Sequence, residues 1–184
     1  FSFPAKLTDC GAHAFDALCY PGDSIREEYK EDILVGYRWH DTKKIPALFP
    51  FGHGLSYTTF AYGKPQASAK TMASDGSLSV SVPVKNTDHV AGKEVVQLYI
   101  GDDRCEQLRP LKELKHFRKI YLLPGEEKTV TFTLTPDDLK YYDPLACAWL
   151  ADEGKFTVYI GSSSADIRGK LSFEMVNVVH PTSN

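Results

Sequence analysis

The sequence has no long apolar run, no excess of one charge and few cysteines, and each absence excludes a class of protein. No stretch approaches the ~20 consecutive apolar residues that a membrane-spanning helix needs, so we expect no membrane partner. The net charge is −3, and no run of Lys and Arg is suited to a phosphate backbone, so we expect no nucleic-acid partner. The most basic stretch, 112–119, contains Leu114 and Phe117, which favour a half-buried strand face.

The four cysteines are Cys10, Cys19, Cys105 and Cys147, and neither they nor the six histidines have the spacing of a zinc site. We therefore expect no metal and no cofactor. Cys10 and Cys19 could close a small loop in an oxidising compartment, but buried free thiols are the simpler interpretation. Charge and cysteine use fit a bacterial cytoplasm and a periplasmic or secreted location equally, so the compartment is left open.

Motifs for a self-contained active site are also missing. The sequence has no HExxH or GxSxG motif, and Gly52 and Gly54 lack the third glycine and the lysine of a phosphate-binding loop. A glycosidase needs two carboxyl groups on either side of its substrate. The adjacent acidic pairs at 102–103, 126–127 and 137–138 lie at turns, where carboxylates are solvated or cap the backbone. We therefore expect no catalytic residue in this chain.

Period-two alternation dominates the chain after Tyr62. In Ser77–Lys85 the apolar residues Leu78, Val80, Val82 and Val84 face one way, which predicts a strand. The same pattern recurs at 94–100, 128–135, 155–161 and 170–175, and less regularly at 116–123. Turn-forming residues separate these runs, so the pattern predicts an all-β sandwich.

Two details of this region carry further expectations. Pro83 lies inside the first run and lacks a backbone donor, so it suggests an edge strand or a bulge. Residues 136–139 predict a single helical turn at a corner of the sandwich, with Tyr141 and Tyr142 packed beside it.

The region before Tyr62 is less regular. Residues 1–23 look loop-like, whereas 24–41 would place Ile25, Tyr29, Ile33, Tyr37 and His40 on one face of a helix. An extended conformation over 32–39 is the alternative, and Gly36 weakens both. The region has too few apolar residues for a core of its own, so it needs a neighbour.

Exposed aromatic rings can stack on sugars, and the candidates here are Trp39, Tyr141, Tyr142 and Trp149. At this density most aromatic residues belong to a core or an interface. The substrate-binding residues therefore stay unknown from the sequence.

Several segments together resemble one enzyme family. The segment 29–63, YKEDILVGYRWHDTKKIPALFPFGHGLSYTTFAYG, resembles the C-terminal region of glycoside hydrolase family 3, the family of β-glucosidases and β-xylosidases. Residues 82–102 and 109–117 resemble two further motifs of that family. The departures are small: His116 stands where the family usually has Gly, and Asp88-His89 replaces a Gly-Asp turn.

The resemblance implies a mainly β fold. Residues 62–184 would form a fibronectin type III-like, immunoglobulin-like β-sandwich, and residues 1–61 the extended, partly helical tail of an α/β sandwich domain. The chain does not begin with Met, and we expect Phe1 to lie inside that domain. LFPFGHGLSYTTF, residues 48–60, would be the joint, with its aromatic rings buried and with Gly52 and Gly54 in tight turns. His53 would be packed and hydrogen-bonded rather than an acid or base.

The resemblance also implies that the full enzyme hydrolyses β-linked glycosides with retention of configuration. In that family the nucleophilic Asp and the acid/base Glu lie upstream, and neither motif occurs here, so we expect this chain alone to be non-catalytic. Its partners would be the upstream catalytic domains, in cis or in trans, and the loop 102–110 would point toward the active-site mouth. The alternative is a free-standing carbohydrate-binding or adhesion module of the same β fold.

Overall fold

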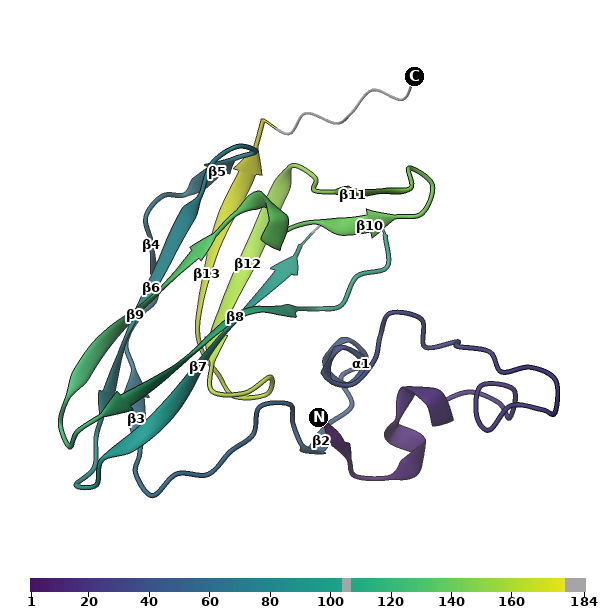
Figure 1. The fold of residues 1–184 in the computed structure, drawn as a ribbon, viewed down its shortest axis with the longest axis horizontal. Helices are drawn as coiled ribbons and strands as arrows, with labels where there is room; N and C mark the ends of the chain where they lie inside the picture. The colour runs from purple at the N-terminus through teal and green to yellow at the C-terminus, as the bar shows by residue number, and fades with distance from the viewer. Residues whose placement is uncertain (104–106, 178–184) are drawn as a thin grey trace.

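A computed structural model describes residues 1–103 and 107–177 and consists mainly of two packed β-sheets (Figure 1). One sheet has the strand order β5-β13-β12-β7-β8, with bounds Thr71–Ala73, Ile167–Val176, Gly154–Gly161, Gly92–Asp102 and Glu113–Leu122. The other has the order β3-β6-β4, with bounds Phe60–Tyr62, Leu78–Asn86 and Gln66–Ala67, and β9 (Glu127–Leu134) also pairs with β6. The predicted β-sandwich is confirmed.

The core lies between the two sheets and follows from the alternation seen in the sequence. Leu78, Val80, Val82 and Val84 of β6 are fully buried, and the alternate residues of the facing strands meet them. Because successive side chains of a strand point to opposite faces, each run contributes one apolar face to this core.

Pro83 was expected on an edge strand or at a bulge, and that expectation is wrong, since β6 has neighbours on both sides. The strand opposite Pro83 is instead split: β3 and β4 pair with the two ends of β6. The Pro83 carbonyl accepts from the Gly63 N–H in this gap (2.8 Å). Since the N and C=O of one strand residue point to the same side, the missing donor also faces the gap.

Residues 1–59 lie beside the sandwich (Figure 1). They contain the two-stranded sheet β1 (Phe3–Pro4) and β2 (Ala47–Phe49), two 3₁₀ turns, η1 (Leu7–Asp9) and η2 (Gly11–His13), and helix α1 (Tyr37–Lys43). Their buried apolar residues are only Cys19, Leu34 and Trp39. The expected shortage of core is confirmed.

The helix predicted over 24–41 is wrong for most of its length, since α1 begins only at Tyr37. Gly36 precedes it with φ +61°, a conformation outside the helix. Upstream, the Asp23 carboxylate accepts from two backbone N–H groups, those of Ile25 and Arg26, and so stabilises a local turn instead. Ile25 is 92% exposed, so the expected apolar helix face has no core to cover.

A helical turn and a hairpin follow β9 at one side of the sandwich. The helical turn predicted near Pro136 is confirmed as η3 (Pro136–Asp138), and the hairpin β10 (Tyr141–Asp143) and β11 (Ala148–Leu150) follows it. Cys10, Cys19 and Cys147 are free thiols, and Cys105 lies outside the described residues. The expected burial of the first two is right for Cys19, whereas Cys10 is only half-buried. No helix within the described ranges is long and apolar enough to cross a membrane.

Candidate functional site: the joint and the pocket beside it

The joint begins with a tight turn over residues 50–53. The Pro50 carbonyl accepts from the His53 N–H (3.0 Å), and Gly52 has φ +81°. The positive φ favours glycine at this position, and a Cβ there would also force the amide end of the Gln97 side chain in β7 to shift. Gly54 has no positive φ, and a methyl group added there would meet no other atom, so only one of the two expected glycine roles is confirmed.

Phe51 connects the joint to both parts of the chain. Its ring lies 5.0 Å from the ring of Tyr37 in α1, and Tyr37 in turn meets Tyr99 of β7 edge-on. Its carbonyl accepts from the backbone N–H of Ser164 in the sandwich (2.9 Å). Phe51 therefore packs where the first segment meets the sheet.

The other aromatic residues of the joint do not all follow this expectation. Phe60 is half-buried against the core, but Phe49 is exposed and Tyr57 is 95% exposed. The expected burial of the loop's aromatics is right for Phe51 and Phe60 and wrong for the other two.

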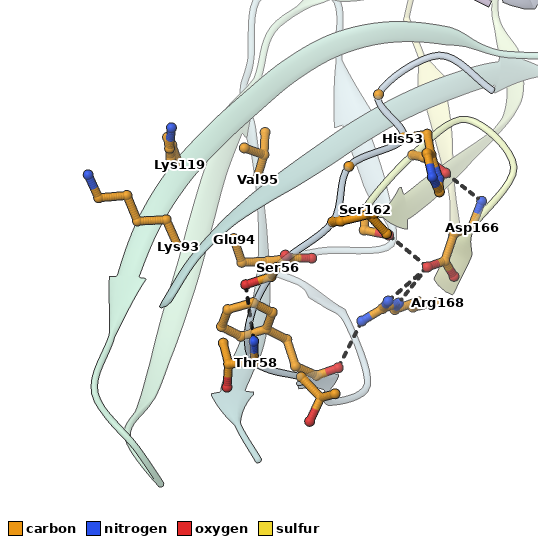
Figure 2. Close-up of a pocket in the computed structure, with 16 residues that line it drawn as sticks. His53, Ser56, Thr58, Lys93, Glu94, Val95, Lys119, Ser162, Asp166 and Arg168 are labelled. Atoms are coloured by element: carbon orange, nitrogen blue, oxygen red, sulfur yellow. Dashed lines mark hydrogen bonds and ion pairs between the residues drawn. The ribbon is translucent and has the colours of Figure 1, made fainter. Parts of the chain in front are cut away.

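His53 is exposed, and its ring lies 5.7 Å from that of Phe49. Within the described residues no hydrogen bond to its ring is seen, so the expectation of a packed, hydrogen-bonded histidine is wrong for this chain. It lies at the edge of a pocket instead (Figure 2).

Helix α1 is fixed to the start of β8 by polar contacts. The Lys112 ammonium lies 2.7 Å from the Asp41 carboxylate, and both side chains are largely buried. The Tyr37 hydroxyl and the Thr42 hydroxyl accept from two backbone N–H groups of 111–114. Burial raises the pKa of Asp41, and the hydrogen bond from Lys112 opposes that rise.

Arg109 organises the neighbouring loop. Its guanidinium pairs with Asp102 (3.0 Å) and with Glu113 (3.6 Å), and it lies over the ring of Tyr141. It also donates to the carbonyl of Leu139 (3.3 Å). These carboxylates therefore neutralise a buried arginine. Because residues 104–106 lie outside the described part, the expected reach of the loop 102–110 toward an active site stays a prediction.

A pocket of about 730 Å³ opens between the joint, β7, β8 and the loop after β12 (Figure 2). Its lining mixes both charges with hydroxyl groups and one aromatic ring, and its principal members are Ser56, Phe60, Lys93, Glu94, Asp166 and Arg168.

Two charged groups of the pocket have defined partners. Arg168 donates to the Asp166 carboxylate from Nε and Nη2 (3.1 and 2.8 Å) and to the Phe60 carbonyl from Nη1 (2.8 Å). Arg168 also lies over the ring of Tyr62 (4.9 Å) and holds the pKa of Asp166 below its usual value. These contacts of the Arg168 guanidinium hold the loop after β12 against the joint.

Glu94 is the carboxylate with spare capacity. The Tyr62 hydroxyl donates to its Oε1 (2.7 Å), and burial raises the pKa of Glu94. Burial also raises the pKa of Tyr62, so the phenol is a donor and not an anion.

Sequence reasoning missed Glu94, although a signal for it exists. Glu94 is in phase with Val96, Leu98 and Ile100, so it falls on the buried face at the end of an otherwise apolar strand. A carboxylate at such a position costs free energy unless it is partnered. The Lys112–Asp41 pair has no local signal, because 71 residues separate its members.

Of the four aromatic candidates for sugar stacking, the structure brings Tyr142 and Trp149 together. Trp39 is buried in the first segment, where its indole N–H donates to the Asp9 carbonyl. Tyr142 and Trp149 are exposed on the hairpin, with centroids 5.7 Å apart and planes at 68°. Tyr141 is half-buried beneath Arg109. The rings of Tyr142 and Trp149 are therefore adjacent but do not form one flat surface.

Comparisons with known proteins add an independent finding. Residues 94–164 match the family model of the fibronectin type III-like domain. The chain is 62% identical over 176 residues to β-glucosidase BoGH3A of Bacteroides ovatus, covering 96% of this chain and 24% of that protein. It is 47% identical over 178 residues to thermostable β-glucosidase B of Acetivibrio thermocellus, covering 97% and 23%.

Solved structures agree with these matches. The Bifidobacterium adolescentis GH3 β-glucosidase superposes with a TM-score of 0.86 at 31% identity, over 99% of this chain and 27% of that one. DesR, a β-glucosidase from Streptomyces venezuelae solved with D-glucose, gives 0.86 at 38% identity, over 94% and 22%. The chain thus spans about a quarter of the length of the relatives that it matches.

Proposed function

From the premise that this chain corresponds to the C-terminal region of glycoside hydrolase family 3 enzymes and carries their fibronectin type III-like domain, we propose that it is a non-catalytic accessory region of such an enzyme. The whole enzyme hydrolyses β-linked glycosides and resembles the β-glucosidases. Its two catalytic carboxyl groups lie outside residues 1–184. The proposed domain boundary lies between residues 61 and 62.

The joint is the observation that carries this proposal. The first segment has almost no core of its own, yet α1 is held on the sandwich by a buried ion pair and by the ring of Phe51. A sandwich that fixes one side of an incomplete segment acts as a support for the domain to which that segment belongs. The sandwich would therefore hold the end of the α/β domain in its position.

The exposed apolar residues of the first segment indicate where the rest of that domain would pack. Single exposed apolar residues are ordinary, but this segment exposes most of its large apolar side chains. These exposed residues are Phe1, Phe3, Leu7, Phe15, Tyr20, Ile25, Tyr29, Ile33, Val35, Leu48, Phe49, Leu55 and Tyr57. The partner that we propose is the upstream catalytic part, in the same polypeptide or as a separate chain.

The intact mass of the protein in its native producer tests the proposal, with an antibody against residues 82–135 as the probe. We expect a band several times larger than 20.5 kDa, with β-glucosidase activity in the same immunoprecipitate. A band near 20.5 kDa that brings down a separate catalytic chain would support the arrangement in trans. A band of that size with neither activity nor partner would contradict the proposal.

A free-standing carbohydrate module is the second candidate, and the exposed Tyr142–Trp149 pair is the observation in its favour. The same assay separates the two candidates, since a free module requires the small band alone.

A further inference from the structure

We propose that the pocket beside the joint binds a neutral saccharide, with the Glu94 carboxylate accepting hydrogen bonds from its hydroxyl groups. The inference stands on the chemistry of the pocket and does not depend on the proposed accessory function. Figure 2 shows Glu94 and Ser56 among the residues that line the pocket.

The first argument is the unused capacity of Glu94. A carboxylate offers about four acceptor sites on its two oxygens. Within the described residues only the Tyr62 hydroxyl is seen to donate to it, and that bond occupies Oε1. Glu94 is only half-buried and belongs to the lining of the pocket, so its second oxygen is available to a ligand there. Neighbouring hydroxyls of a sugar supply the O–H donors that such a group accepts.

The second argument is the balance of charge, which favours a neutral ligand. An anion would meet Glu94, and because Asp166 and the Phe60 carbonyl already engage Arg168, only the exposed Lys93 and Lys119 would be left to pair with it. A cation would meet Lys93, Lys119 and Arg168. A polyol carries no charge and uses donors and acceptors together, so it meets neither repulsion.

The third argument is size and wall composition. A volume of about 730 Å³ falls within the range of small-molecule sites, roughly 300–1,000 Å³. Ser56 adds a hydroxyl group on the joint side, and Phe60 adds an aromatic ring. A lining that combines polar groups with the aromatic ring of Phe60 suits a sugar, because a sugar ring has apolar C–H faces and a polar edge.

The pocket is a better candidate than the exposed Tyr142–Trp149 pair. The two rings of that pair lie at 68° to each other and cannot stack on one sugar face together. The pocket instead brings together polar and aromatic groups from three separate parts of the chain.

Titration of the ¹⁵N-labelled 184-residue chain with cellobiose, followed by amide chemical shifts, tests the proposal. We expect saturable shifts at the amides of Gly54, Thr59 and Lys93, all of which line the pocket or border Glu94. Glu94→Gln keeps the shape of the side chain but replaces one acceptor by a donor. It should weaken binding about tenfold or more, the loss of a hydrogen bond to a charged group.

Three controls make the result decisive. Glu127→Gln removes an exposed carboxylate on β9 and should leave the affinity unchanged. Ser56→Trp places an indole in the pocket from an exposed position and should abolish the shifts. Glucuronate tests the charge argument and should bind more weakly than cellobiose.

Absence of saturable shifts with cellobiose in the unsubstituted chain would overturn the proposal without reference to any variant. Shifts scattered outside the pocket, equal affinity of Glu94→Gln, or stronger binding of glucuronate would overturn it as well.

Discussion

At the scale of single residues, Lys112 is the buried charge that holds α1 against the start of β8. Its ammonium is nearly buried and faces Asp41, whose pKa is already raised by burial. A buried pair adds little compared with apolar residues of the same size, but removal of one partner leaves the other charge uncompensated.

We expect Lys112→Ala to lower the free energy of unfolding by about 3 kcal/mol, because Asp41 loses its counter-charge in a desolvated position. Urea unfolding followed by circular dichroism measures this loss. Lys128→Ala is the matched control, since Lys128 forms an exposed pair with Glu126 and should cost less than about 1 kcal/mol. Equal effects of the two variants would show that the Lys112–Asp41 pair carries no special weight.

Glu94 gives a prediction on pH. Burial raises its pKa in the folded state above the unfolded value, so between these two values the folded chain binds more protons. Stability contributed by this group is therefore present at pH below the unfolded pKa and is lost as pH rises through the folded pKa. Glu94→Gln should raise the melting temperature at pH 7 and make little difference near pH 4. A difference that grows as the pH falls would have the wrong sign for a buried carboxyl group.

Phe51 gives a prediction on local order. Phe51→Ala removes the ring that packs on Tyr37, and we expect the first segment to open more easily by about 1–2 kcal/mol while the sandwich stays folded. Limited proteolysis should cut residues 1–50 several-fold faster, with the fragment containing residues 62–177 resistant. Phe117→Ala, at an exposed ring on β8, is the control and should leave the cutting rate as it was.

At the scale of secondary-structure elements, the split strand opposite Pro83 explains how a proline lies inside a sheet. Gly63 occupies the gap, and a Cβ there would overlap the ring of Pro83. The two residues are therefore coupled although 20 positions separate them.

We expect Gly63→Ala to destabilise the chain by about 1–3 kcal/mol through this overlap. The same substitution in a Pro83→Ala background should cost clearly less, which a double-mutant cycle of urea unfolding measures. Gly76→Ala is the control, because a Cβ there meets its neighbours only at ordinary contact distance. Additive effects of the Gly63 and Pro83 substitutions would refute the coupling.

The same scale shows what the sequence could and could not predict. The strands were predictable because alternation is local: Leu78, Val80 and Val82 reveal their common face within five residues. The prediction of a helix over 24–41 was wrong because apolar spacing stabilises a helix only where the apolar face packs on a core, and Ile25 packs on no core. The pocket and the Lys112–Asp41 pair join distant segments, so no local pattern specifies them.

At the scale of the whole molecule, the chain is a folded sandwich joined to a segment that lacks its own interior. We expect the isolated chain to show no hydrolysis of aryl β-glucosides above background, because the carboxyl pair for that chemistry lies elsewhere in the proposed enzyme. A chromogenic β-glucoside assay on the purified chain measures this. Turnover that survived purification and disappeared on substitution of a residue within 1–184 would contradict the expectation.

The gap opposite Pro83 also determines the order in which strand pairings would bear a mechanical force. Once the contacts of α1 and Phe51 have opened, a force on the first segment reaches the sandwich along the chain through β3, which pairs with residues 84–86 of β6. Beyond β3 the ladder is interrupted, and β4 pairs separately with residues 80–81. The three residue pairs of β3 would therefore bear this force first, and β4 would bear it only after β3 had come away from β6.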